Sequence, residues 1–218
     1  MLLTEYFNNS IKKNDTFQHG CWAPLYYGVV SKIINDNSYN TYCEIGIGYG
    51  THIKNIFVNT KIEKIFIVDP MKFYLNDQFV NDIVNKEPDI NFKTINNDNK
   101  ISNFNQMFYM INNYLDDYKE KYTWFRKESL KITNNDISDN SLDCIFIDGD
   151  HSYEAVLGDL NLWWKKLKVN GTILGDDYWM KPVERAVNEF SNNINQSPIF
   201  LNNNINTSYK IYSFRKLS

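Results

Sequence analysis

Residues 41–50 read TYCEIGIGYG, a β-rich apolar run that leads directly into three alternating glycines. Gly46, Gly48 and Gly50 follow a predicted strand at residues 41–45 and precede a helix-like stretch. Glycine allows a tight turn and lets the backbone approach a bound ligand closely. The stretch therefore predicts a buried strand that ends at a nucleotide-type binding turn, although a glycine turn after a strand can also be purely structural.

Four more β-rich apolar runs follow, at residues 65–68, 122–125, 142–147 and 172–174. They are continuous rather than alternating, which is typical of strands buried on both faces of a parallel sheet. All five runs except the one at 65–68 are followed by helix-like stretches, and apolar residues recur with helical spacing over 104–115 and from Val156 to Leu167. The alternation predicts an α/β fold, a doubly wound and mostly parallel sheet with right-handed crossovers.

The chain of 218 residues is expected to form a single domain. A helical segment over residues 1–39 precedes the core of residues 40–218. Within this core, residues 71–100 form a polar insertion that could be a lid, a substrate wall or an inert loop. Two extended runs at residues 198–201 and 209–214 predict an antiparallel hairpin that completes a seven-stranded sheet.

Charge and composition exclude several partners. The formal net charge is −3 and the pI about 5.6, so no general attraction to nucleic acid or to an anionic membrane is expected. No apolar run approaches the roughly 18 residues of a membrane span, and an Asn-Asn pair interrupts the N-terminal apolar stretch. We expect a soluble, cytoplasmic protein whose three cysteines are reduced.

Asp69 ends the second predicted strand, where a carboxylate can accept hydrogen bonds from both hydroxyls of a ribose. The dinucleotide fingerprint would require a further glycine at position 51, but Thr51 stands there. The sequence therefore favours a nucleotide ligand other than NAD.

Three carboxylates follow the fourth and fifth predicted strands: Asp148, Asp176 and Asp177. Carboxylates that converge at neighbouring strand ends repel one another unless they are protonated, hydrogen-bonded or bridged by a cation. An oxygen cluster of this kind suits Mg²⁺, and less specifically Mn²⁺ or Ca²⁺. The alternative is that Asp176 or Asp177 caps the following helix and that Asp150 is a solvated loop acid.

His151 lies three residues after Asp148, where both side chains can face one pocket. An imidazole with an ordinary pKa can accept a proton from a substrate hydroxyl at neutral pH. His151 and Asp148 are therefore the predicted catalytic residues, whereas His19 and His52 are interpreted as structural.

The pattern Glu44, Gly46, Gly48 and Gly50, with Asp69 at the next strand end, resembles motifs I and II of class I S-adenosylmethionine-dependent methyltransferases. That family has a Rossmann-like sheet closed by an antiparallel seventh strand. The resemblance implies S-adenosylmethionine as cofactor, with the glycine turn under its methionine part and Asp69 on its ribose. It also implies that Glu128 and Ser129 lie near the adenine.

A more specific resemblance covers residues 147–179 and 182–190. This segment is similar to the group that includes macrocin-type and mycinamicin-type sugar O-methyltransferases and the cephalosporin-hydroxylase-like proteins. The resemblance implies that Asp148, Asp176 and Asp177 bind Mg²⁺ and that His151 acts as base. Catechol-type O-methyltransferases typically have Asn at the position of Asp177, which favours the sugar-modifying group.

The sequence thus predicts a metal-assisted O-methyltransferase that acts on a sugar, a nucleotide-sugar or another glycosylated small molecule, either as a monomer or as a homo-oligomer. Two alternatives stay open. The first is a non-catalytic module that binds S-adenosylmethionine or a nucleotide-sugar, and the second is a metal-dependent hydroxylase-like protein.

Overall fold

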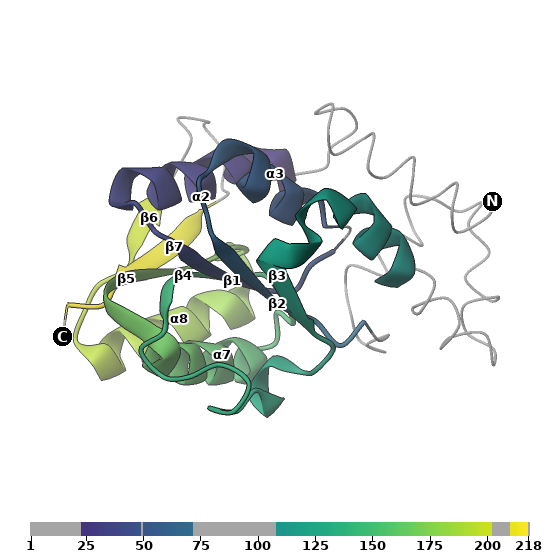
Figure 1. Cartoon of the computed structure of the whole chain (residues 1–218). Coiled ribbons are helices and arrows are strands. Elements are labelled where there is room, and N and C mark those ends of the chain that lie inside the picture. Colours follow the sequence, from purple (N-terminus) through teal and green to yellow (C-terminus); the bar gives the residue numbers. More distant parts are fainter. Residues whose placement is uncertain (1–22, 49, 72–107, 202–209, 218) are drawn as a thin grey trace, which may run out of the picture.

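The computed structural model describes residues 23–48, 50–71, 108–201 and 210–217, and for residues 23–27 it describes the backbone only. These residues form a sheet of seven strands, the helices α2, α3, α7 and α8, a further helical stretch at 108–114 and two short 3-10 helices (Figure 1). In chain order the elements are α2 (Ala23–Asn37), β1 (Thr41–Ile45), α3 (Thr51–Asn59), β2 (Lys64–Val68), η1 (Asp116–Lys121), β3 (Tyr122–Phe125), η2 (Ser129–Lys131), β4 (Leu142–Ile147), α7 (Tyr153–Lys166), β5 (Leu167–Gly175), α8 (Lys181–Ile194), β6 (Ile199–Leu201) and β7 (Ile211–Arg215).

The seven strands form one sheet in the order β3-β2-β1-β4-β5-β7-β6. The first five in this order run parallel, and β7 lies antiparallel between β5 and β6. This arrangement confirms the predicted doubly wound, mostly parallel sheet with its C-terminal antiparallel hairpin.

The register of the parallel strands brings their carboxyl ends to one level. Ile45 pairs with Val68 on β2 and with Ile147 on β4, and Ile147 pairs with Gly175 on β5. The residues that directly follow these strand ends must therefore lie along one edge of the sheet. They are Gly46, Asp69, Asp148 and Asp176.

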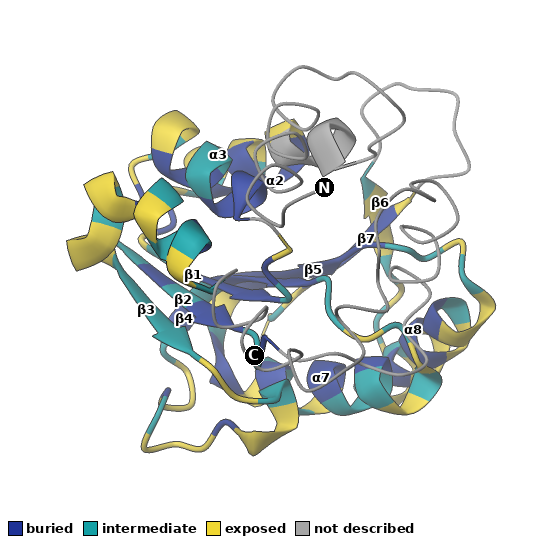
Figure 2. Ribbon diagram, turned by 90° about the vertical axis from the view of Figure 1, so that its right-hand side faces the viewer, coloured by how far each residue is buried: buried dark blue, intermediate teal, exposed yellow. Residues whose placement is uncertain are grey.

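Helices cover both faces of the sheet (Figures 1 and 2). On one face, α2, α3 and the helical stretch 108–114 bury residues such as Ile34, Ile53 and Ile111 against the sheet. On the other face, α7 and α8 bury residues such as Trp163 and Phe190. Two apolar layers thus hold the sheet on both sides, as its continuous apolar strands predict.

The structure corrects two expectations drawn from the sequence. β5 begins at Leu167 rather than at residue 172, because α7 ends at Lys166 and Leu167 pairs directly with Leu142. The β4–β5 register then shifts before Cys144, an irregularity that periodicity does not reveal. No α-helix follows β3 within residues 126–141, where the 3-10 helix η2 takes its place.

Other expectations fall partly on residues that lie outside the described ranges. Of the helical segment expected over residues 1–39, the structure describes α2, and of the insertion expected over 71–100 it describes residue 71 alone.

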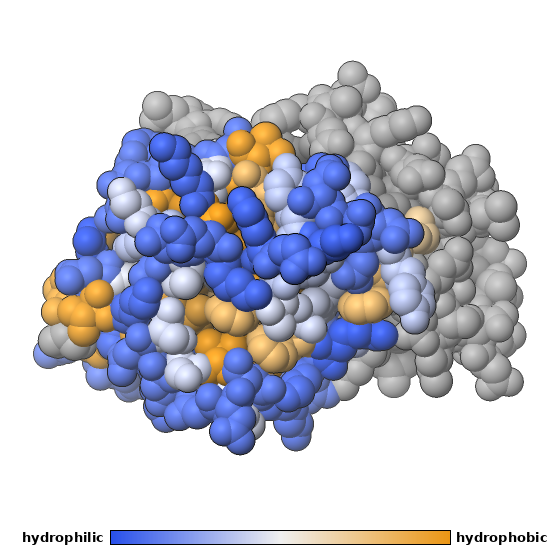
Figure 3. All heavy atoms as spheres, viewed as in Figure 1, coloured by the Kyte–Doolittle hydropathy of each residue, from blue (hydrophilic) through white to orange (hydrophobic). Residues whose placement is uncertain are grey.

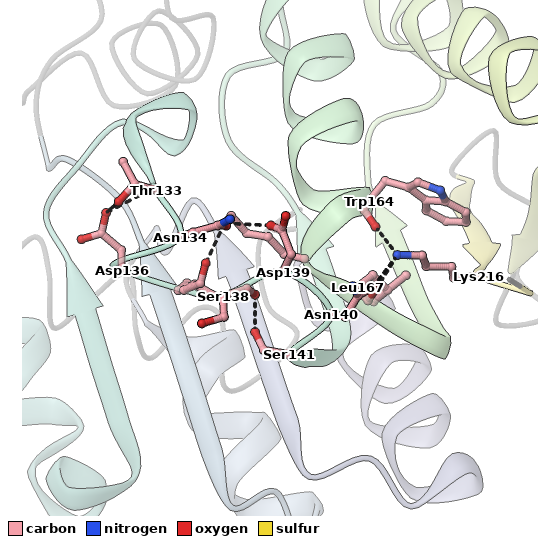
Figure 4. Close-up of polar contacts among 12 residues, drawn as sticks. Thr133, Asn134, Asp136, Ser138, Asp139, Asn140, Ser141, Trp164, Leu167 and Lys216 are labelled. Carbon is pink, nitrogen blue, oxygen red and sulfur yellow. Dashed lines mark hydrogen bonds and ion pairs between the residues drawn. The ribbon is translucent and has the colours of Figure 1, made fainter.

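Two lysines stabilise the opposite edge of the sheet, before β4 and β5. Lys216 donates hydrogen bonds to the carbonyl of Leu167 at 2.8 Å and to the side chain of Asn140 at 3.0 Å (Figure 4). The buried Lys166 donates to the carbonyl of Ile137 at 2.7 Å. These bonds fix the loop before β4, and they lie at the end of the sheet opposite to the carboxyl ends of the parallel strands.

Hydrophilic residues cover most of the described surface on the face drawn in Figure 3, and apolar residues form small separate areas there. Among the described helices, none combines the length and the apolar character needed to cross a lipid bilayer.

Gly175 allows the close approach of a buried tyrosine to the end of β5. A Cβ atom at position 175 would lie 2.1 Å from the hydroxyl oxygen of Tyr212, a residue that is only 1% exposed. We expect Gly175→Ala to destabilise the protein by about 1–3 kcal/mol, because a packed core resists added volume. Gly28→Ala is the control: Gly28 lies exposed within α2, and a Cβ atom there would have no neighbour within 4 Å, so alanine should stabilise the helix by about 0.5–1 kcal/mol. Urea unfolding measures both changes, and an unchanged midpoint for Gly175→Ala would contradict the expectation.

Candidate functional site

The glycine turn after β1 has a backbone that other residues rarely adopt. Gly46, Gly48 and Gly50 have φ angles of +84°, +51° and +78°. A Cβ atom on Gly46 would lie 2.0 Å from the carbonyl oxygen of Asp148. The turn therefore requires glycine at position 46, and it lies directly against the residue that follows β4.

Asp69 connects the end of β2 to this turn. One of its carboxylate oxygens accepts a hydrogen bond from the amide of Ile47 at 3.0 Å, and the other accepts one from the amide of Met71 at 2.6 Å. Asp69 thus stabilises the turn by a hydrogen bond. Its binding to a ribose remains a prediction.

Glu44 lies beneath the turn and is only 2% exposed. The hydroxyl of Tyr42 donates a hydrogen bond to Glu44 Oε2 at 2.7 Å, and His52 Nδ1 lies 2.8 Å from the same oxygen. Burial, and then the neighbouring Glu44 carboxylate, raise the pKa of Tyr42 well above its ordinary value. Sequence reasoning did not connect Tyr42 or His52 with Glu44, because His52 belongs to α3 and the contact forms only when that helix packs on the sheet.

The second part of the site is a cluster formed by Asp148, His151 and Asp177. One candidate ligand atom from each lies within 4.8 Å of the others. His151 Nε2 lies 2.8 Å from Asp177 Oδ2 and 3.7 Å from Asp148 Oδ1. Burial by itself would lower the pKa of His151, but hydrogen bonding and charge interactions with the two carboxylates outweigh it and raise the pKa to about 10.

Asp176 lies outside this three-residue cluster, although the sequence predicts it as a metal ligand with Asp148 and Asp177. Its side chain is buried, and its Oδ1 atom has no hydrogen-bond partner among the described residues. Burial, followed by the charges of Asp148 and Asp177, raises its pKa well above the ordinary value. A buried carboxyl oxygen without a partner is unfavourable unless a ligand satisfies it.

Asp177 has an uncommon backbone conformation for a non-glycine residue, with a φ of +57°. Its side chain accepts a hydrogen bond from the indole nitrogen of Trp179 at 2.7 Å. Trp179 is 48% exposed, so an aromatic surface borders the cluster. Strained backbone of this kind is often retained where a side chain must be aimed at a ligand.

Glu128 and Ser129 follow β3 and are both half-buried. The Ser129 hydroxyl donates a hydrogen bond to Asp159 on α7. Sequence reasoning missed Asp159. The pattern that could have identified it is an acidic residue on the apolar face of α7, between Val156 and Trp163. Asp159 thus fixes the segment that is predicted to border the adenine.

The buried Asp159 predicts a pH dependence of stability. Burial raises its pKa to about 7, against hydrogen bonds that lower it. Between about pH 4 and pH 7 the folded protein therefore holds a proton that the unfolded chain has released. Stability should fall as pH rises through this interval and should level off above it.

Urea unfolding between pH 5 and pH 8 measures this effect. Asp159 should change the free energy of unfolding across this pH range by a few kcal/mol at most, and in Asp159→Asn this contribution should disappear. Asp117→Asn, which changes an exposed acid of η1, should leave the wild-type profile unchanged. Parallel profiles for the wild type and Asp159→Asn would show that burial does not retain the proton.

The fold is a Rossmann-like α/β fold, and the candidate ligand site lies along the carboxyl edge of its parallel strands. The glycine turn occupies the end of β1, and the acidic cluster lies beside it at the ends of β4 and β5. A family model described as a methyltransferase domain matches residues 43–178, and the chain belongs to this family.

Similar solved structures share the fold at low sequence identity. A protein of Methanococcus maripaludis assigned as an S-adenosyl-L-methionine-dependent methyltransferase is 14% identical, with 97% of this chain and 92% of that chain covered and a TM-score of 0.59. The O-methyltransferase NovP is 16% identical over 88% of this chain and 78% of its own, with a TM-score of 0.58. The SAH-bound methyltransferase PaMTH1 of Podospora anserina is 12% identical over 99% of this chain and 88% of its own, with a TM-score of 0.56.

Among curated proteins, the chain is similar to the uncharacterized protein R132 of Acanthamoeba polyphaga mimivirus. The two are 28% identical over 153 residues, which cover 68% of this chain and 58% of R132. The match thus spans less than two thirds of that relative's length.

Proposed function

We propose that the protein transfers a methyl group from S-adenosylmethionine to a hydroxyl oxygen of a small acceptor, with the help of a divalent cation, Mg²⁺ first. The observation that carries this proposal is the contact between Gly46 and the backbone of Asp148. This contact places the cofactor-type turn directly beside the acidic cluster. Methyl transfer needs the donor and the acceptor side by side in a fixed geometry.

The proposed cofactor site extends along three strand ends. The glycine turn accommodates the methionine part, Asp69 accepts the ribose hydroxyls, and Glu128 and Ser129 border the adenine. The first turn of α3 has a glycine N-cap that provides no side-chain cap, and its sequence has no acidic residue. Such a helix start favours a negatively charged ligand group, and the carboxylate of the methionine part is one.

The cluster fits a divalent cation by its donor set. Asp148 and Asp177 supply carboxylate oxygens, and the unsatisfied Oδ1 of Asp176 lies in the same buried acidic surroundings. Oxygen-rich donor sets suit Mg²⁺ and Mn²⁺. When bound, the cation would lower the pKa of an acceptor hydroxyl and S-adenosylmethionine would supply its methyl group, so that a carbon–oxygen bond forms as the carbon–sulfur bond breaks.

In this proposal His151 accepts the proton of the acceptor hydroxyl, and Asp148 and Asp177 orient the imidazole. The two carboxylates alone hold the pKa of His151 near 10, which keeps the ring protonated at neutral pH. A cation bound to these carboxylates would oppose that effect and lower the pKa of His151, so that the neutral ring could accept a proton. In this proposal His151 can therefore act as the base only when the cation is bound.

We propose a sugar or a glycosylated small molecule, such as a nucleotide-sugar, as the acceptor. Vicinal hydroxyls of a sugar can bind one cation together. Trp179, half-exposed and fixed by its hydrogen bond to Asp177, offers an aromatic surface at the edge of the cluster. Aromatic rings of this kind provide an apolar body with a polar end, which suits a ligand with both kinds of surface.

Calorimetric titration tests the cofactor assignment. S-adenosylmethionine and S-adenosylhomocysteine should both bind to the purified protein, and NAD, which shares the adenosine part, should not. Repeating the titration with Mg²⁺ and with EDTA separates cofactor binding from the cation. Failure of both sulfur nucleotides to bind under either condition would overturn the proposal, and binding would justify a screen of sugar acceptors for methyl transfer.

A further inference from the structure

A buried group of three polar side chains lies under the glycine turn. Tyr42 and Glu44 come from β1, and His52 comes from the first turn of α3. Their exposed fractions are 0%, 2% and 4%. Glu44 Oε2 lies 2.7 Å from the hydroxyl of Tyr42 and 2.8 Å from Nδ1 of His52. The three side chains therefore form one compact polar group inside the apolar layer between the sheet and α3.

A carboxyl group buried in an apolar layer is costly unless polar partners compensate it. Glu44 has two such partners, the hydroxyl of Tyr42 and the ring nitrogen Nδ1 of His52. The His52 ring is itself fixed by edge-on packing, with ring centroids 5.1 Å from Phe146 and 6.4 Å from Tyr42. The group is thus held in a defined geometry from the sheet and from the helix.

This group joins the two ends of the turn. Glu44 precedes Gly46 on the strand side, and His52 follows Gly50 on the helix side. Three glycines make the turn conformationally permissive, so its shape must be maintained by surrounding contacts. Asp69 holds the turn through the amide of Ile47, and the contact between Glu44 and His52 fixes its two ends.

We infer that His52 and Glu44 are positioning residues that hold the glycine turn in its ligand-binding shape, so that Glu44 acts through the turn rather than by contact with the cofactor. The inference rests on the proposed function, in which this turn lies under the methionine part of S-adenosylmethionine. Loss of the contact should therefore weaken binding of that part of the ligand while the adenosine part binds as before.

Two ligands separate these effects: S-adenosylhomocysteine, and 5′-methylthioadenosine, which lacks the amino-acid part. If His52→Ala reduces the population of the binding-competent turn to about a tenth, the Kd for S-adenosylhomocysteine should rise about tenfold. The Kd for 5′-methylthioadenosine should stay within about twofold of the wild type. Calorimetry at a temperature well below the unfolding transition of each variant gives both values.

Conservative variants keep the test independent of folding. His52→Gln retains an amide donor and should recover part of the affinity for S-adenosylhomocysteine. In a double-mutant cycle, Glu44→Gln and His52→Ala should be non-additive, because each removes the same contact. Val58→Ala, at a position of α3 that is 63% exposed, is the matched control and should leave both Kd values unchanged.

The outcomes distinguish the inference from the proposed function. A wild-type protein that binds neither S-adenosylmethionine nor S-adenosylhomocysteine overturns the proposed function, and the inference falls with it. A wild type that binds both, together with a His52→Ala variant of unchanged affinity, overturns the inference alone. An equal loss of affinity for S-adenosylhomocysteine and 5′-methylthioadenosine would show a general structural defect and would also contradict it.

Discussion

Gly46→Ala should reduce the affinity for S-adenosylmethionine at least about 100-fold, the largest effect that we expect from a single methyl group, since each 1.4 kcal/mol is about tenfold. The left-handed backbone at φ +84° costs an L-residue about 1–2 kcal/mol. The new Cβ would also lie 2.0 Å from the Asp148 carbonyl oxygen and 2.9 Å from Gly149 Cα. Because these are backbone atoms, the end of β4 and the turn must move apart.

Calorimetry with S-adenosylmethionine measures this loss, and circular dichroism shows whether the sheet is retained. Gly48→Ala is the matched control, because Gly48 has a φ of +51° but a Cβ atom there would have no neighbour within 4 Å. Gly48→Ala should show the effect of backbone strain alone. If the whole strain energy opposes binding, the affinity should fall about tenfold. Equal affinities for Gly46→Ala and the wild type would mean that the ligand does not use this turn.

Removing the acidic cluster is the second change with a large expected effect. Asp148→Asn and Asp177→Asn should each weaken binding of Mn²⁺, used as the probe for the cation, by more than about 10–100-fold, the range for loss of outer-shell partners of a metal. The physical reason is that each substitution removes one of the two carboxylate charges that lie together with His151. Paramagnetic resonance of free Mn²⁺ during a titration measures the affinity.

Asp150→Asn provides the control for this change. Asp150 is an exposed acid two residues after Asp148, and it accepts a hydrogen bond from the amide of Ser152 at 2.8 Å instead of joining the cluster. It should bind Mn²⁺ like the wild type. Unchanged Mn²⁺ affinity in both Asp148→Asn and Asp177→Asn would remove the cation from the proposed mechanism, while S-adenosylhomocysteine binding would still test the cofactor site separately.

Local sequence patterns predicted most of the sheet because the signals for buried strands are local. The runs at 41–45, 122–125 and 142–147 correspond to β1, β3 and β4 at both ends. The start of β5 was missed because Leu167 has the spacing of the α7 apolar face but pairs with Leu142 across the sheet. The absence of a helix at residues 126–141 was missed for a similar reason, since that segment is held by contacts with distant residues such as Lys166 and Asp159.

The candidate site was also predicted only in part from the sequence. The order of strands in a parallel sheet brings residues after consecutive strand ends to one edge, so the sequence could place Gly46, Asp69, Asp148 and Asp177 near one another. It could not separate Asp177 from Asp176. In the structure Asp177, with a φ of +57°, joins His151 in the cluster, whereas Asp176 does not. Metal and cofactor binding at these residues stay predictions that the titrations above would test.

The sequence by itself determined the order of the strands along the chain, the glycine turn and the acids at the strand ends, because each depends on residues close together in the chain. Only the tertiary structure decided that Glu44 is enclosed by Tyr42 and His52, that Ser129 is bonded to Asp159, and that the buried Asp176 has a carboxyl oxygen without a hydrogen-bond partner among the described residues. These contacts arise when helices pack on the sheet, and the orientation of each side chain then depends on neighbours from other elements. Burial makes such polar contacts energetically important, and burial is a property of the folded chain.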